Sequence, residues 1–133
     1  PDFVPIIGAE GWQISNSPVL SMACLRESMS IFDEASMKDI RAKSELLTGY
    51  LEYLVKTISD KVEIITPADP SQRGNQLSLV IKENGKNVFN KLGDKGVVCD
   101  WREPDVIRIA PSPLYNSYAD IYFFFKILKS LLV

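Results

Sequence analysis

Histidine is absent from all 133 residues of the chain. This absence excludes Ser-His-Asp and Cys-His nucleophilic sites, histidine acid-base catalysis and the imidazole ligands of most transition-metal centres. The acidic cluster Asp100, Glu103 and Asp105 lacks further ligands at metal-binding spacing, so it is interpreted as a solvated loop. The sequence therefore predicts no metal site.

Cysteine is nearly absent, because only Cys24 and Cys99 occur and they lie far apart. Two such residues provide neither a CxxC motif nor a dense disulfide framework, which favours a reduced, cytoplasmic protein. The longest apolar run, from residue 121 to 133, is interrupted by Lys126 and Lys129 and is too short to span a bilayer. We therefore expect a soluble protein without a membrane partner.

An excess of positive charge is also missing. Fifteen Lys and Arg stand against seventeen Asp and Glu, for a net charge of −2 and a pI of about 5.2. Such a chain presents no electrostatic footprint for nucleic acid. At 14.9 kDa it has room for one domain. Because it begins with Pro1 and its last predicted helix runs to its end, we expect it to be part of a longer protein.

Hydrophobic periodicity predicts alternating helices and strands. Pro and Gly in the first 17 residues predict an extended lead-in, which leaves residues 18–133 for the core. Helical spacing and period-two alternation then predict helices over 18–35, 36–58, 84–94 and 118–132, and strands over 62–65, 77–81, 97–101 and 106–110. Helices gathered around a small, mainly antiparallel sheet indicate the α+β class, an α/β two-layer sandwich.

Three helix starts carry capping signals. Ser17 followed by Pro18 is typical of an N-cap and a first helical residue, and Ser36 and Ser117 each precede an aspartate by three residues, as in a capping box. Gly49 lies inside the second predicted helix, where it costs about 1 kcal/mol relative to alanine.

Arg108 is the residue that most strongly suggests a binding function. In a strand its side chain emerges on the same face as Val106 and Ala110, whereas Ile107 and Ile109 point the other way. An arginine among small apolar neighbours requires an anion, and its planar fork suits a carboxylate, either of a ligand or of an internal Asp or Glu. The residues alone leave both alternatives open, together with a side chain that merely reaches solvent.

The segment Gly11–Pro18, with the sequence GWQISNSP, places polar groups just before a helix N-terminus. Ser15 and Asn16 in this segment have two interpretations. They cap the helix, which these residue types favour, or they help to hold a polar ligand at the exposed backbone N–H groups.

Four segments together resemble the C-terminal part of the kynureninase family. They are GWQISNSP at 11–18, LLTGYLEYL at 46–54, GVVCD at 96–100 and IRIAPSPLYNS at 107–117, and they occur in the order found in that family. The resemblance covers essentially the whole chain. It implies the small C-terminal domain of a homodimeric, pyridoxal 5′-phosphate-dependent enzyme with the aspartate aminotransferase fold.

The resemblance also implies an activity and roles for three residues. The family hydrolyses kynurenine or 3-hydroxykynurenine to alanine and anthranilate or 3-hydroxyanthranilate, in tryptophan catabolism and NAD biosynthesis. Arg108 takes the position of the arginine that binds the substrate α-carboxylate. Asn16 takes that of the asparagine beside the cofactor and the substrate ring, and Ser15 that of its neighbour, which recognises ring substituents.

The cofactor-binding lysine of the family belongs to the large domain, and no motif in this chain matches it. Lysines such as Lys38, Lys43, Lys56 and Lys91 lie at helix positions typical of solvated faces. The chain alone is therefore expected to be inactive and to need the large domain. An alternative is a non-catalytic amino-acid-binding or interaction module that uses Arg108 to hold a carboxylate without a reaction.

Overall fold

The computed structural model describes residues 2–132, and the chain divides into two compact units between Ser36 and Met37. The first unit contains a short 3-10 helix, η1 (Ala9–Trp12), and the helix α1 (Val19–Ala35). The predicted extended lead-in is thus interrupted by one helical turn. In the structure α1 groups with the lead-in, whereas the sequence interpretation places it with the core.

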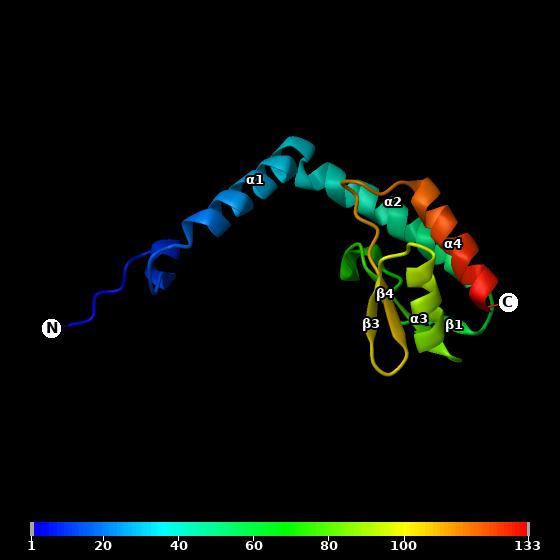
Figure 1. The fold of residues 1–133 in the computed structure, drawn as a ribbon. Helices are drawn as coiled ribbons and strands as arrows, with labels where there is room; N and C mark the ends of the chain where they lie inside the picture. Colours follow the sequence, from blue (N-terminus) through cyan, green and yellow to red (C-terminus); the bar gives the residue numbers. More distant parts are fainter. Residues whose placement is uncertain (1, 133) are drawn as a thin grey trace. The chain divides into compact units, whose positions relative to one another are not determined.

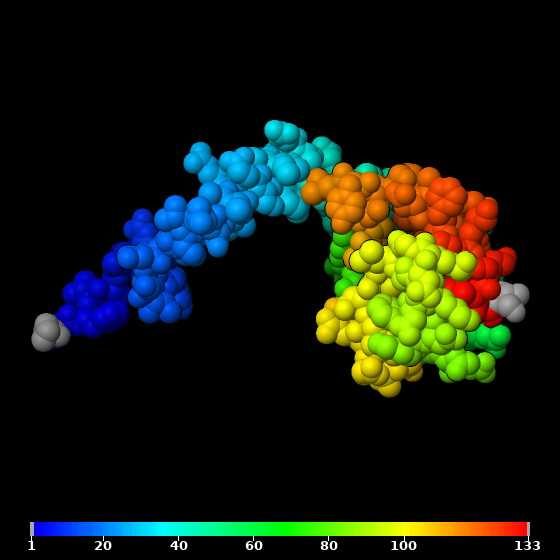
Figure 2. Space-filling view, in the orientation of Figure 1, coloured from blue at the N-terminus to red at the C-terminus, as the bar shows by residue number. Residues whose placement is uncertain are grey.

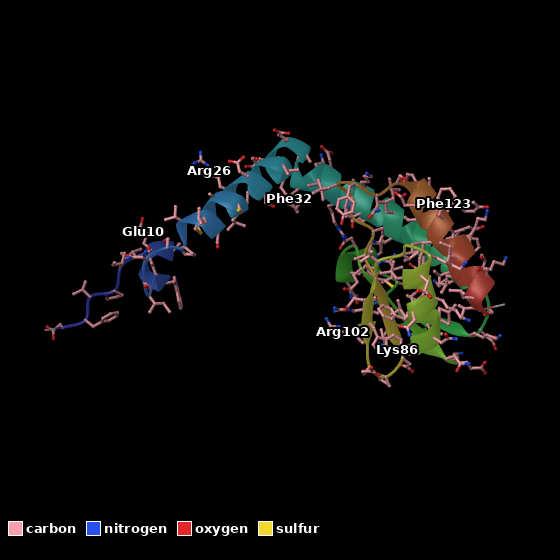
Figure 3. All side chains as sticks on the ribbon, viewed as in Figure 1. Glu10, Arg26, Phe32, Lys86, Arg102 and Phe123 are labelled. Carbon is pink, nitrogen blue, oxygen red and sulfur yellow. The ribbon has the colours of Figure 1, made fainter. Side chains whose placement is uncertain are left out.

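Helix α1 has no buried residue. Its apolar side chains Met22, Leu25, Met29 and Phe32 recur every three or four residues and form one stripe along the helix, at least a third of each side chain being exposed. Figure 3 shows the side chains of α1, Phe32 among them, standing clear of the helix. The N-terminal unit therefore has an amphipathic helix without a core of its own.

The C-terminal unit combines three helices with one sheet (Figure 1). Its elements in chain order are α2 (Met37–Lys56), β1 (Val62–Ile64), a 3-10 helix η2 (Pro70–Gln72), β2 (Leu77–Ile81), α3 (Gly85–Asp94), β3 (Asp100–Arg102), β4 (Val106–Ile109) and α4 (Tyr118–Leu132). The strands form a four-stranded sheet in the order β1-β2-β4-β3, with every neighbouring pair antiparallel. The predicted α+β class and antiparallel sheet are confirmed.

Alternation along the strands gives the sheet one buried and one open face. Leu77, Leu79 and Ile81 of β2 and Ile107 of β4 are at most 1% exposed. They pack against helix residues that are equally buried, namely Leu47 and Leu51 of α2, Leu92 of α3 and Leu128 of α4. All three helices therefore cover the same face, and residues at the intervening strand positions face away from the core.

The third predicted strand begins later than its sequence suggests. The sequence predicts a strand over 97–101 that includes Val97 and Val98, whereas β3 starts at Asp100. The backbone N–H of Val97 donates to the Leu92 carbonyl at 3.0 Å, and Gly96 has a φ of 80°. The segment after α3 thus satisfies the end of that helix, which prevents it from pairing as a strand and leaves Val98 fully exposed.

The structure confirms one of the predicted helix starts and corrects another. Ser117 and Asp120 form the expected box at α4, because the Ser117 backbone N–H donates to Asp120 Oδ2 at 2.8 Å and the Asp120 N–H donates to Ser117 Oγ at 3.3 Å. At α1 the prediction is wrong by one residue. The helix begins at Val19, and Pro18 rather than Ser17 is its N-cap, without a side-chain capping bond.

Gly85 allows α3 to approach the sheet closely. A Cβ atom at this position would lie 3.2 Å from a ring carbon of Trp101 and 3.3 Å from the Cβ of Ile81. Trp101 in turn packs against Phe89, with ring centroids 5.8 Å apart, and Lys86 lies over its ring. In the space-filling view of Figure 2, α3 and the β3–β4 hairpin, coloured yellow-green to gold, form much of the visible surface of this unit.

Candidate functional site

Arg108 lies on the open face of the sheet. Its strand neighbour Ile107 is fully buried on the core face, so the arginine must emerge on the opposite face. Across the sheet it is paired with Ser78 of β2 on one side and with Asp100 of β3 on the other. Its side chain is 32% exposed, which leaves the guanidinium partly desolvated and still accessible.

Asp100 is the internal partner of Arg108. The Arg108 Nε–H donates to Asp100 Oδ2 at 2.6 Å, and Arg108 Nη2 contacts the same oxygen. Arg102, two residues along β3, also donates to this oxygen through its Nε at 2.9 Å. The resulting trio, Asp100, Arg102 and Arg108, is called the guanidinium cluster below.

The charge of this cluster is unbalanced. The hydrogen bond from Arg108 is the main cause that lowers the pKa of Asp100 below its ordinary value, against a smaller opposing effect of desolvation, and the charges of both arginines add to the lowering. Asp100 is therefore ionised at neutral pH. Two guanidinium groups and one carboxylate give the cluster itself a net charge of +1, which attracts anions locally. Glu63 of β1 adds an acidic residue to the same face of the sheet, because its register partner Val80 lies on that face.

The carboxylate partner of Arg108 was one of the alternatives that the sequence left open. The predicted strand over 97–101 correctly includes Asp100, which lies in β3, so the solvated-loop interpretation is wrong for Asp100 and holds for Glu103 and Asp105 in the turn. The missed signal is symmetry about the turn. Residues 102 and 106, 101 and 107, and 100 and 108 pair in register, so a three-residue turn at 103–105 brings Asp100 opposite Arg108. The role of Arg108 in binding a ligand stays a prediction.

Ser15 and Asn16 are exposed residues of the N-terminal unit. They lie between η1 and the start of α1, and Gln13 Nε2 donates to the Ser15 carbonyl at 2.9 Å. The structure brings Arg108 together with Asp100 and Arg102 within the C-terminal unit, whereas Ser15 and Asn16 belong to the other unit. Their roles toward a substrate or cofactor stay predictions.

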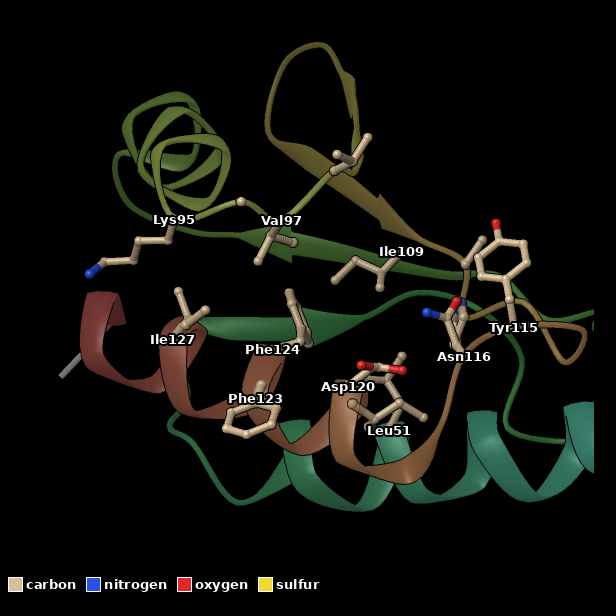
Figure 4. A pocket seen from close by; sticks show the side chains of 15 residues that line it. Leu51, Lys95, Val97, Ile109, Tyr115, Asn116, Asp120, Phe123, Phe124 and Ile127 are labelled. Carbon is tan, nitrogen blue, oxygen red and sulfur yellow. The ribbon is translucent and has the colours of Figure 1, made fainter.

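A pocket of about 500 Å³ opens on the other side of the sheet from Arg108. Figure 4 shows α4 along one side of it, and β4 with the 95–98 segment along the other. Its lining is mainly apolar and includes Val97, Ile109, Phe123, Phe124 and Ile127. No predicted site residue lines it, because Arg108 points to the face opposite Ile109.

Asp120, one of the polar residues that line this pocket, has a structural task. Asp120, which caps α4, accepts hydrogen bonds from Ser117, and these bonds lower its pKa.

Two of the lysines that the sequence does not assign to a cofactor have clear hydrogen-bond partners. Lys43 Nζ donates to the Pro113 carbonyl at 2.6 Å, and Lys56 Nζ donates to Glu52 at 2.5 Å.

Within residues 2–132, no three His, Cys, Asp or Glu side chains gather as metal ligands would. Cys24 and Cys99 are both free thiols. None of the helices in the described part of the chain combines the length and the apolar character that a membrane span requires.

Solved structures share this fold. A NifS-like protein superposes with a TM-score of 0.75 over 97% of this chain and 38% of its own, at 21% sequence identity. A mutant of C-DES, solved with glycine covalently linked to its PLP cofactor, superposes with a TM-score of 0.74 over 94% of this chain and 35% of its own, at 12% identity. At these identities the likeness concerns the fold.

Sequence relatives identify the family. The model of the kynureninase C-terminal domain matches residues 40–128. The kynureninase of Myxococcus xanthus (strain DK1622) is 51% identical over 130 residues, which are 97% of this chain and 30% of the relative. That of Xanthomonas campestris pv. campestris (strain B100) is 56% identical over 126 residues, 92% of this chain and 30% of the relative. The chain thus spans about a third of the length of the curated relatives it matches, and it belongs to the kynureninase family, as its C-terminal domain.

Proposed function

We propose that this chain is the substrate-carboxylate-binding part of a pyridoxal-phosphate-dependent kynureninase. The parent enzyme hydrolyses kynurenine or 3-hydroxykynurenine to alanine and anthranilate or 3-hydroxyanthranilate, a step of tryptophan catabolism and NAD biosynthesis in the cytoplasm. Membership of the kynureninase family supports this activity, and the free thiols of Cys24 and Cys99 are consistent with a reducing compartment.

The observation that carries the proposal is the accessible edge of Arg108. A guanidinium has five N–H donors arranged in two forks, and Asp100 takes the fork formed by Nε and Nη2. Within residues 2–132 Nη1 has no partner, and the Arg108 side chain is 32% exposed, so the fork formed by Nη1 and Nη2 stays accessible to a second anion. This is the arrangement that a bidentate α-carboxylate needs, and it fixes the amino-acid end of the substrate while the aryl ketone reacts.

Asn16 and Ser15 complete the contribution of this chain. We assign Asn16 to the cofactor and the substrate ring, and Ser15 to the ring substituents, at an active site formed with the large domain and a second subunit of a homodimer. Their exposed side chains and the unburied apolar stripe of α1 support this assignment, because both need a surface from outside the N-terminal unit.

Pyridoxal 5′-phosphate, when bound, supplies an electron sink for carbanion chemistry. The donors of this chain fit a minor share of its site. Asn16 offers an exposed amide toward it, whereas Lys43 and Lys56 are engaged with Pro113 and Glu52. We assign the lysine that attaches the cofactor to the large domain of the parent, which lies outside this chain. The task of this chain is to bind and orient the substrate.

The test uses the full-length parent with its cofactor, assayed by release of anthranilate from kynurenine. Arg108→Lys keeps the charge but loses the fork, so we expect KM to rise about 10- to 150-fold, the equivalent of about 1.5–3 kcal/mol. Arg26→Lys, an exposed arginine of α1 outside the guanidinium cluster, is the matched control and is expected to change KM less than about threefold. An unchanged KM in Arg108→Lys would refute the assignment.

A second arm assays the 133-residue chain alone with added pyridoxal 5′-phosphate. We expect activity in the parent and none in this chain, because the attachment lysine lies outside it. Activity in neither, with a correctly folded parent, would mean that the family fold has been retained without kynurenine hydrolysis.

A further inference from the structure

Asp100 contacts Arg108 in a way that differs from an ordinary surface ion pair. The two residues face each other directly in the β3–β4 register, so the backbone fixes the separation of their Cα atoms. Asp100 meets only the side edge of the guanidinium, through Nε and Nη2, and within residues 2–132 the structure gives Nη1 no partner. A single carboxylate oxygen thus holds the arginine from one side.

The pair contributes little to stability. The side chains of Arg108 and Asp100 are 32% and 50% exposed, and solvent screens an ion pair at that exposure. The main consequence of the pair is that it fixes the orientation of the Arg108 side chain. An arginine side chain has many rotamers, and a partner on its Nε edge removes most of them, which leaves the other edge aimed in one direction.

Arg102 keeps this arrangement attractive to an anion. If Asp100 were paired with Arg108 alone, the two charges would cancel. Because Arg102 donates to the same Oδ2 oxygen at 2.9 Å, the guanidinium cluster retains a net positive charge. Arg102 lies on β3 at the outer side of the sheet, where its head group reaches solvent (Figure 3). It therefore offsets the charge of Asp100 without occupying the free edge of Arg108.

We propose that Asp100 is a positioning residue for substrate binding, which holds the side edge of Arg108 so that its end edge receives the α-carboxylate. This inference rests on the proposed function, because it assumes that Arg108 binds a carboxylate. The opposite role is also testable. If Asp100 instead occupied the place of the substrate, it would compete with the substrate, and its removal would lower KM.

The experiment uses the full-length parent with its cofactor and the variants Asp100→Asn, Asp100→Glu and Asp105→Asn. Asparagine keeps the size and one acceptor oxygen but loses the charge, so we expect KM for kynurenine to rise about tenfold while kcat changes less than about twofold. Asp100→Glu, which restores the carboxylate, should recover part of the loss. Asp105, in the same hairpin turn, is the matched control and should leave KM unchanged.

A second readout separates positioning from a general structural role. The amine formally obtained from kynurenine by removing its carboxyl group serves as an inhibitor that cannot use Arg108. Asp100→Asn should leave the inhibition constant of this amine within about twofold, whereas the constant of a carboxylate-bearing inhibitor should rise by the same factor as KM. Equal weakening of both inhibitors would overturn the proposal.

The variant Arg108→Lys and its combination with Asp100→Asn distinguish the positioning role of Asp100 from the carboxylate-binding role of Arg108. Asp100→Asn should have no further effect on KM once Arg108 is replaced, because both act on one contact. If Arg108→Lys raises KM and Asp100→Asn does not, or lowers it, positioning is overturned and the proposed function stands. If neither variant changes KM, the carboxylate role of Arg108 fails and this inference fails with it.

Discussion

Helices α1 and α2 follow each other in the chain and have similar lengths, 17 and 20 residues, yet only one of them builds a core. Helix α2 buries six residues between Ser44 and Val55, whereas α1 buries none. Helix α1 nevertheless has an apolar stripe of Met22, Leu25, Met29 and Phe32 at helical spacing. The comparison shows that periodicity specifies a helix and its apolar face but does not specify what covers that face.

The polar contacts of the two units differ in the same way. In the N-terminal unit, Gln13 and Ser30 donate to carbonyls only two and three residues away. In the C-terminal unit, Arg73 pairs with Glu52 across 21 residues, and Lys43 reaches Pro113 across 70. Long-range contacts fix one tertiary arrangement, so the C-terminal unit carries the stability of this chain.

The largest expected effect tests this division with one chemical change at two places. Leu47 in α2 is fully buried, and Leu25 in α1 is 52% exposed. Leu47→Ala should lower the free energy of unfolding of the 133-residue chain by about 2–5 kcal/mol, because it removes buried contacts and leaves a cavity. Leu25→Ala should lower it by about 0.5 kcal/mol or less. Urea unfolding followed by circular dichroism measures both.

The same two variants test whether another surface covers α1 in the full-length parent. If another part of the parent or a second subunit covers α1, Leu25→Ala should cost at least about 1 kcal/mol there, while the cost of Leu47→Ala stays similar. Equal costs of the two variants in the isolated chain would contradict the division into a packed and an unpacked unit.

A smaller effect is expected at the pair of Glu52 and Arg73. The Arg73 side chain is only 3% exposed and its Nη1 lies 2.6 Å from Glu52 Oε2. Glu52→Gln leaves a buried guanidinium without its counter-ion, and Arg73 Nε already lacks a hydrogen-bond partner in the described structure. We expect a loss of about 2 kcal/mol at pH 7, measured by urea unfolding.

The pH dependence of this loss provides its control. Desolvation acts to raise the pKa of Glu52, but hydrogen bonds and charges from Lys56 and Arg73 outweigh it and lower the pKa below the ordinary value. A group with a lowered pKa in the folded state stabilises the protein above its unfolded pKa, near about 4.3, and this contribution is lost as the pH falls through the folded value. The difference between the native chain and Glu52→Gln should therefore shrink as the pH falls below the unfolded pKa. A constant difference would rule out this ion pair as its source.

Much of the fold could be predicted from the sequence, because its signals are local. Alternation at 77–81 and helical spacing at 84–94 correspond closely to β2 and α3. The strand predicted over 97–101 was misplaced because two valines look like a strand, whereas the carbonyl groups at the end of α3 require the N–H of Val97. That competition depends on a neighbouring element, which a window of residues does not reveal.

For the candidate site, the sequence predicts the direction of the Arg108 side chain but not its partner. Alternation around Arg108 indicates that its side chain leaves the core, and the structure agrees. Its pairing with Asp100 depends on the length of the turn at 103–105, which sets the register between two strands. The positions of Ser15 and Asn16 relative to a substrate depend on surfaces beyond the N-terminal unit, so periodicity within this chain carries no information on them.

The smallest expected effect concerns glycine in the packed helix. Helix α2 contains Gly49, whereas α1 has no glycine, so tertiary packing holds α2 despite an unfavourable residue. A Cβ atom at Gly49 would meet nothing within 4 Å, so Gly49→Ala should raise the free energy of unfolding by about 0.5–1 kcal/mol. Gly96 has equally open surroundings but a φ of 80°, and Gly96→Ala should lower it by about 1 kcal/mol. Urea unfolding measures both changes in the free energy of unfolding, and opposite signs would show that backbone conformation, not space, decides the effect. A lower free energy of unfolding in both variants would mean that α2 requires Gly49 for a reason beyond its packing in this unit.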